Sequence, residues 1–288
     1  MPKKTWQKLI GVSRHLKILQ REQAKVEARF FLSLSQMFHR MGKEAEKRLL
    51  EQKGSINIDK VIGKKWEKEL GGILQTHYEQ AALVSAAIEW EMHQPRESAK
   101  GLFGYVRKGF WSALKGLPGK IINAVIQKVS DIADELEPKK IIDTIKKKVK
   151  KVIEDVVGGR ARKVPDLPRE VEIAQKVKEE VFDKASNASR AKGIAATESQ
   201  GGMGLGGQMA IEALGELGLV DQKQWRCLHG TGNIDGRVRP AHKEANYQTV
   251  SVHDKFWVGG ERADYPGDHK LSPGNRCQCR CLAVGISR

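Results

Sequence analysis

Apolar residues recur at steps of three, four or seven from the start of the chain to about residue 217, a spacing that places them on one face of a helix. The pattern predicts a long helix over residues 5–50 and a second over 66–92, which together would form an antiparallel hairpin. Three shorter amphipathic helices with basic outer faces are predicted within 101–157. Further helices are predicted over the ranges 171–181, 188–199 and 209–217.

A glycine cluster, GGMGLGG at 201–207, separates the last two of these helices. It lacks the GK[ST] ending of a phosphate-binding P-loop, and it does not follow a strand in a βαβ unit. Nucleotide binding is therefore disfavoured. The cluster indicates either a flexible joint or a point where two helices pack closely.

The periodicity changes after Trp225. Residues 247–252 alternate and are rich in β-branched side chains, which predicts a strand, and 256–258 predict a second. We therefore expect an α+β fold, with a long N-terminal basic helical region and a smaller α+β C-terminal module of few short strands. The Gly, Pro and basic residues of GRARKVPDLPRE mark a linker. The expected domains are an N-terminal helical hairpin (1–100), amphipathic basic helices with the linker (101–164) and the C-terminal module (165–288).

The net charge of +16 bears on partners more than on fold. It is concentrated in 1–50, with twelve Lys and Arg against four acids, and in 138–163, with ten against three. Such basic stripes favour a polyanion, with nucleic acid first and an anionic membrane surface second; the alternative is a solvated helix face. The candidate DNA-binding residues are Lys146, Lys147, Lys148, Lys150, Lys151, Arg160, Arg162 and Lys163.

Membrane association is the less favoured reading. No stretch approaches the roughly 20 apolar residues that cross a bilayer, and the N-terminus lacks an apolar signal region. The aromatic and basic residues interleaved within 101–115 are typical of surface-seeking helices, but packing on another subunit is the commoner use of such a stripe. We expect a protein made in a cytosol.

All four cysteines lie near the C-terminus, and in a cytosol such clustering indicates metal binding or free thiols. A structural zinc needs four N/S ligands. The spacing C-x-C-x-C is tight, so Cys279 and Cys281 would supply two ligands, with Cys277 as a substitute for one of them. His242 and Cys227 are the best candidates for the remaining two ligands, and His229 or His269 come next. The alternatives are one structural zinc, the only cofactor expected, or unliganded thiols in a terminal turn.

Catalytic residues are not evident in the same region. Cys227 and His229 are too close along the chain for a typical nucleophile–base pair, and the aspartates at 235, 254, 264 and 268 have no distinctive spacing. A metal-dependent nuclease of the HNH kind would need a strand–helix spacing that is not apparent. We predict that the chain is not an enzyme.

An ordered series of short motifs runs through the C-terminal module: IAATE at 194–198, Trp225, DGRVRPAH at 235–242, FWVGG at 256–260, YPGD at 265–268 and CRC at 279–281. Over about residues 170–284 this series resembles the phage Mu F-like family of minor head, or head morphogenesis, proteins of tailed bacteriophages. Ala196 and Gln278 stand where the family pattern has Arg and Asn, and Cys277 is additional. The matching positions are Thr197, Glu198, Trp225, Asp235, Arg237, Arg239, Tyr265 and Pro266, besides His242, Cys279 and Cys281.

The resemblance implies a virion component present in few copies. Such a protein would be incorporated during procapsid assembly with the portal, the scaffold or the major capsid protein. It would lie in the capsid interior or at the portal vertex, and in the host cytoplasm during assembly, and would contact double-stranded DNA without sequence preference. His242, Cys279 and Cys281 would form a structural cluster. The alternatives are a cryptic enzyme of nuclease or ADP-ribosyltransferase type and a membrane-active ejection protein.

Overall fold

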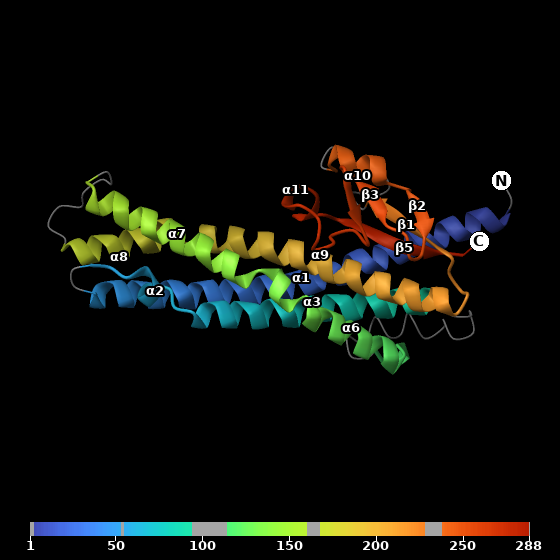
Figure 1. The fold of residues 1–288 in the computed structure, drawn as a ribbon, viewed down its shortest axis with the longest axis horizontal. Coiled ribbons are helices and arrows are strands. Elements are labelled where there is room, and N and C mark those ends of the chain that lie inside the picture. The colour runs from blue at the N-terminus through green and yellow to red at the C-terminus, as the bar shows by residue number, and fades with distance from the viewer. Residues whose placement is uncertain (1–2, 53–54, 94–113, 160–167, 228–237, 288) are drawn as a thin grey trace. The chain divides into compact units, whose positions relative to one another are not determined.

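A computed structural model describes residues 3–52, 55–93, 114–159, 168–227 and 238–287. The fold is α+β as predicted, with long helices first and short antiparallel strands confined to the C-terminal part of these ranges (Figure 1). The helices are α1 (Lys3–Glu51), α2 (Ile58–Val61), α3 (Lys65–Met92), α6 (Gly119–Asp131), α7 (Pro138–Val157), α8 (Arg169–Glu180), α9 (Lys184–Glu216), α10 (Pro240–Ala245) and α11 (Pro273–Arg276), with 3-10 turns η2 (Leu114–Gly116) and η3 (Ala133–Leu136).

The chain divides into two compact units built from interleaved segments. Unit 1 comprises Met1–Ala28, Thr76–Ile132 and Ala196–Arg288, and unit 2 comprises Arg29–Gln75 and Ala133–Ala195. This division differs from the three consecutive domains expected from composition, because α1, α3 and α9 each contribute residues to both units. The expected boundaries near residues 100 and 165 fall in the ranges 94–113 and 160–167, outside the described residues.

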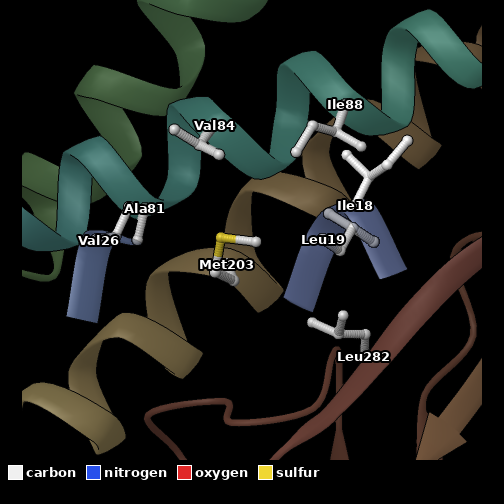
Figure 2. Packing of buried hydrophobic residues seen from close by; sticks show 8 residues of the cluster. All are labelled: Ile18, Leu19, Val26, Ala81, Val84, Ile88, Met203 and Leu282. Carbon is white, nitrogen blue, oxygen red and sulfur yellow. The ribbon is translucent and has the colours of Figure 1, made fainter. Parts of the chain in front are cut away.

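The core of unit 1 joins three helices to one strand. α1, α3, α9 and the last strand each contribute to one cluster of buried aliphatic side chains. Figure 2 places Val26 beside Ala81 and Ile18 beside Ile88, so α1 and α3 run antiparallel there. This agrees with the predicted hairpin. The cluster consists of Ile18, Leu19, Val26, Ala81, Val84, Ile88, Met203 and Leu282.

The glycine cluster lies inside α9, which runs without interruption from Lys184 to Glu216. A Cβ atom added at Gly206 would lie 1.8 Å from the carbonyl oxygen of Ala82, and one at Gly202 would lie 2.6 Å from that of Tyr78. The glycines therefore allow α9 and α3 to approach backbone to backbone. Close helix packing is the correct alternative, and the flexible joint and the break between two helices are wrong.

The strands form two small antiparallel sheets in unit 1. The first has the order β2-β1-β5, from β1 (Gln222–Cys227), β2 (Thr249–Ser251) and β5 (Cys281–Ile286). The second is the hairpin of β3 (Phe256–Val258) and β4 (Glu261–Ala263). The predicted strands over 247–252 and 256–258 correspond to β2 and β3. β1, β4 and β5 were not predicted.

α7 packs an aliphatic face inside unit 2. Ile142, Ile145, Val149, Val152 and Val156 are buried, whereas Ile141 is half-buried. The buried stripe is therefore offset by one residue at its start from the pattern of the sequence, which placed Ile141 on it. Within the described ranges, no helix is long and apolar enough to cross a membrane.

Candidate metal centre

Sheet pairing brings together two cysteines that lie far apart in the sequence. Cys227 ends β1 and Cys281 begins β5, and the two residues are partners in the antiparallel register. Their sulfur atoms are 3.1 Å apart. Cys279 precedes β5 by two positions, and its sulfur accepts a hydrogen bond from the backbone N–H of Cys281 at 3.4 Å. The tight C-x-C spacing therefore brings the sulfurs of Cys279 and Cys281 close together.

α10 supplies the imidazole of His242. The helix begins at Pro240, whose fixed φ suits the first helical position. The thiol of Cys227 donates a hydrogen bond to the backbone carbonyl oxygen of His242 at 2.9 Å, which ties the helix to β1. The fully buried indole of Trp225 meets the imidazole edge to face, with ring centroids 5.7 Å apart. The imidazole is therefore held in one orientation.

The side chains of His242, Cys279 and Cys281 form a buried group whose ligand atoms all lie within 4.8 Å of one another, and this group could hold a metal ion. The Nδ1 atom of His242 is 3.7 Å from the sulfur of Cys279 and 3.5 Å from that of Cys281. Tetrahedral zinc with ordinary Zn–S and Zn–N distances places sulfur and nitrogen about 3.6 Å apart. The observed separations match that spacing, so little movement is needed for these three atoms.

A fourth ligand would have to come from outside this group of three, and the sulfur of Cys227 is in contact with that of Cys281. Two sulfurs on one tetrahedral zinc are about 3.8 Å apart, whereas Cys227 and Cys281 are separated by 3.1 Å. The half-buried Cys227 side chain must therefore swing away by several tenths of an ångström to share the ion. Cys277 is exposed, and the substitute role predicted for it is not supported by its position.

The other histidine candidates are placed differently. His269 lies 3.3 Å from the Tyr265 hydroxyl and 3.5 Å from the Asp268 carboxylate, in the YPGD turn. It is not part of the buried group around Cys279. His229 lies outside the described residues, as do Asp235 and Arg237 of the family pattern.

The charge state of the sulfurs suits a cation. The hydrogen bond from Cys281 lowers the pKa of the Cys279 thiol well below its usual value, and His242 acts in the same direction against the effect of burial. The contacts with Cys227 and Cys279, together with burial, raise the pKa of the Cys281 thiol well above its usual value. One thiolate is thus already favoured, and a bound cation would favour the others.

The orientation of His242 assigns its two nitrogens. Nδ1 faces the sulfurs, and Nε2 is buried without a hydrogen-bond partner among the described residues. A metal-bound histidine carries its proton on the nitrogen that points away from the ion. Nδ1 would therefore be the ligand, and Nε2 would carry the proton.

Two residues of the IAATE motif on α9 bind the segment 276–281, which carries three of the cysteines and which we name the cysteine turn. The Arg276 guanidinium in α11 meets the Glu198 carboxylate at 2.5 Å, and both side chains are mostly buried. The backbone N–H of Gln278 donates to the Thr197 hydroxyl at 3.2 Å. Arg276 was not predicted, because nothing in its sequence neighbourhood indicates a partner 78 positions away.

Gln200 is a second residue that the sequence did not indicate. It is fully buried, and its amide donates to the carbonyl oxygen of Cys281 at 2.5 Å and to that of Pro266 at 3.3 Å. Its own side-chain oxygen accepts from Gln23 at 2.8 Å. The Gln200 side chain therefore links β5, the YPGD turn and α1. Its bond to Cys281 helps to fix the backbone that carries the cysteine side chains.

The YPGD turn itself packs on the glycine-rich face of α9. A Cβ atom added at Gly204 would lie 2.4 Å from the carbonyl oxygen of Pro266 and 2.5 Å from the ring of Tyr265. The Asp268 carboxylate accepts the backbone N–H of Asp264 at 2.9 Å, so it stabilises the turn. The guanidinium of Arg239 donates to the backbone carbonyl oxygen of Cys277. The family-pattern residues that the structure describes therefore lie together in one module.

The basic residues predicted to contact DNA divide into three groups. Lys147, Lys148, Lys150 and Lys151 are exposed on α7, and we name them the α7 lysine face. Lys146 instead forms an ion pair with Asp59 at 2.8 Å, also inside unit 2. Arg160, Arg162 and Lys163 lie outside the described residues.

In comparisons with known proteins, no protein-family model matches the chain, and no curated protein or solved structure matches it either.

Proposed function

We propose that the chain is a minor head protein of a tailed phage, which acts in head assembly at the portal and binds packaged DNA without sequence preference. The observation that carries the proposal is the meeting of the short motifs on which the resemblance rests. Trp225 packs edge to face on His242 of DGRVRPAH and on Phe256 of FWVGG, and Nδ1 of His242 lies 3.7 Å from the sulfur of Cys279 in CRC. An ordered set of weak motifs gains weight when its members, distant in sequence, contact one another in one module.

The metal site completes the proposal. We infer that His242, Cys279, Cys281 and Cys227 hold one structural zinc, because zinc prefers four tetrahedral N/S ligands and three of these atoms already have that spacing. The module has short strands, so a metal would add the stability that a small core cannot supply. With four protein ligands the ion keeps no open position, and its role is structural.

Head assembly is tested in procapsids purified from cells producing the phage or prophage that encodes the chain. Quantitative mass spectrometry against the portal protein should give a few copies per portal ring. The major capsid protein, counted in the same digest, is the internal control for complete shells. Absence of the chain from procapsids, or a copy number equal to that of the major capsid protein, would contradict the proposal.

DNA binding is expected to depend on the α7 lysine face. Changing Lys147, Lys148, Lys150 and Lys151 together to Gln should weaken duplex binding at 50 mM salt by orders of magnitude. It should also reduce the slope of log K against log salt by about 3 to 4, since each neutralised phosphate contributes about 0.9. The measurement is fluorescence anisotropy with random-sequence duplex DNA from about 50 to 200 mM salt.

The control removes the same charge elsewhere. Lys120, Lys128, Lys243 and Lys255 are exposed outside α7, and changing all four to Gln should leave the salt slope within about one unit of the original value. Equal losses in the two variants would mean that net charge alone attracts DNA, and the α7 assignment would then be wrong.

A further inference from the structure

Cys227 and Cys281 lie directly opposite each other in the antiparallel pairing of β1 with β5. Such pairing alternates between residues that exchange backbone hydrogen bonds and residues that do not. The backbone N–H of Cys227 donates to the side-chain oxygen of Asn246 at 2.9 Å. The backbone N–H of Cys281 donates to the sulfur of Cys279 at 3.4 Å. Since neither N–H donates to the facing residue, the two cysteines form a non-hydrogen-bonded pair.

The geometry of a non-hydrogen-bonded pair suits a disulfide bond. Its Cα atoms lie about 4.5 Å apart, inside the range of about 4.4–6.8 Å that disulfide-bonded cysteines span. Its side chains project from the same face of the sheet, and the sulfur atoms of Cys227 and Cys281 are 3.1 Å apart. An S–S bond of about 2.0 Å therefore requires a movement of about 1 Å and no change in the strand register.

A bond between these two sulfurs and a zinc ion at the site exclude each other. Two sulfurs on one zinc are about 3.8 Å apart, so Cys227 moves away from Cys281 to bind the ion and towards it to form the bond. The bond takes Cys227 and Cys281 out of the ligand set and leaves His242 and Cys279. A structural zinc needs four ligands, so the two that remain would not hold it.

An oxidant can reach the pair through Cys227. Its side chain is half-buried, whereas Cys281 is buried. Susceptibility of a thiol to oxidation follows its exposure, and a sensing cysteine commonly has a second cysteine beside it that completes the disulfide. Cys227 has the exposure of the first, and Cys281 has the position of the second. Cys277 is exposed, but it lies outside the buried group of ligand atoms.

We propose that Cys227 and Cys281 form a cross-strand disulfide when the protein meets a peroxide, and that the same reaction releases zinc from the site. Hydrogen peroxide first oxidises the Cys227 thiol to a sulfenic acid and is itself reduced to water. The Cys281 sulfur then attacks the Cys227 sulfur; the S–S bond forms, the S–O bond breaks, and the oxygen leaves as a second water. When zinc is bound, both sulfurs are deprotonated, so solvent supplies the two protons and the ion departs as Zn²⁺.

Zinc release rests on the proposed metal site, whereas the disulfide rests on the sheet register alone. Disulfides are rare in a reducing cytosol and persist outside the cell. A head protein is assembled in the first environment and enters the second when the host lyses. The ion would therefore hold the module during assembly, and a covalent link between β1 and β5, which constrains the unfolded chain, would replace it afterwards.

The test treats the purified full-length protein with a small excess of hydrogen peroxide. The intact mass should fall by that of two hydrogen atoms, and dithiothreitol should restore it. Digestion without reduction should give one pair of peptides joined through Cys227 and Cys281. A chromogenic chelator should record the release of about one zinc per chain, with the same time course as the joined peptides.

Two cysteine variants are the controls. Cys277→Ser removes the exposed cysteine of the cysteine turn and should form the disulfide and release zinc as the original protein does. Cys227→Ser should keep its intact mass free of the loss of two hydrogen atoms, and circular dichroism checks that it is folded. The peptide mapping is carried out on the original protein, so it decides the assignment even if Cys227→Ser fails to fold.

Three results would overturn the disulfide: thiols that stay reduced, a link through Cys277 or Cys279 in place of the expected pair, or a link between two chains. A protein that contains no zinc but joins Cys227 to Cys281 would contradict the metal site and support the disulfide. Neither the mapping nor the zinc release depends on the copy number in procapsids or on duplex binding by α7. Failure here and failure of the proposed function are therefore distinguishable.

Discussion

Replacing His242 with Ala, or Cys279 with Ser, is expected to abolish zinc binding and to unfold the C-terminal module. Both side chains are buried in the group of three ligand atoms, and α10, β1 and β5 converge on it. Structural zinc contributes about 10–16 kcal/mol of apparent binding free energy in zinc-finger peptides. That is as large as the total stability of about 5–15 kcal/mol typical of a domain, so loss of one ligand should be decisive.

The measurement pairs metal analysis of the purified protein with thermal unfolding. The original protein should carry about one zinc per chain, and its melting temperature should fall by more than about 10 °C when a strong chelator removes the ion. Cys277→Ser is the matched control, because the Cys277 thiol is exposed and lies outside the buried group. It should keep both zinc and stability.

A metal-free protein with full stability would contradict the zinc assignment. So would a His242→Ala variant with the same melting temperature as the original protein. A Cys227→Ser variant that retains zinc would leave the ion in place but would show that the fourth ligand is not Cys227.

Replacing Glu89 with Ala is expected to destabilise unit 1 by about 3–5 kcal/mol, the usual cost of removing one partner from a buried ion pair. The Glu89 carboxylate is fully buried on α3. It lies 3.0 Å from Nε2 of His15 and 3.2 Å from Nε2 of His93, and it accepts the backbone N–H of Gly285 at 2.7 Å. One side chain thus connects α1, α3 and β5, and its removal leaves two buried polar groups and the half-buried imidazole of His93 without their partner.

The same carboxylate predicts a pH dependence. Burial by itself raises the pKa of Glu89, but the charges and hydrogen bonds of His15 and His93 outweigh burial and lower it to about 2, from the ordinary value of 4.5. A lowered folded-state pKa adds stability that is fully present above about pH 4.5 and is lost as the pH falls towards 2. The free energy of unfolding should therefore decrease over that window.

Urea unfolding of the original protein and of Glu89→Gln, at several pH values from 6 to 2.5, checks this expectation. The stability difference between the two should shrink steadily below pH 4.5. Glu79→Gln, on the same helix but half-buried, is the control and should show a small difference that does not follow the same window. A constant difference between Glu89→Gln and the original protein would show that folding does not lower the pKa of the Glu89 carboxyl group.

The strands show which parts of the fold could be predicted from the sequence and which could not. β3 was predicted because aromatic and β-branched residues recur in FWV. β5, with the sequence CLAVGI, is a short apolar run without alternation, and such a run is equally compatible with a buried helix. β1, with QKQWRC, places a charged side chain on the inner face. Lys223 is almost fully buried there and donates to Gln208 and to the carbonyl oxygen of Asp264, and burial lowers its pKa to about 8. No pattern predicts a strand that buries a lysine.

In the candidate site, too, some residues were predicted from the sequence and others were not. His242, Cys279 and Cys281 were predicted from residue type and from the family resemblance, since few side chains other than His and Cys ligate zinc. Their support was not predicted. Gln200 and Arg276 are ordinary surface residues by type, and only the approach of α9 to the cysteine turn gives them buried partners. Lys146 was predicted to meet DNA, but α2 supplies Asp59 to it.

What the sequence by itself determined is local. The 3.6-residue period predicted the helices, the basic stripe predicted the α7 lysine face, and the chemistry of thiol and imidazole predicted the candidate metal ligands. Tertiary structure alone decided which residues meet. The glycine-rich residues 201–207 lie inside α9, at positions where Ala82 and Pro266 leave no room for a side chain. The tertiary structure also places Cys227 opposite Cys281 and two histidines beside Glu89. Such meetings depend on the relative placement of distant segments, which burial and backbone hydrogen bonding fix only when the whole unit folds.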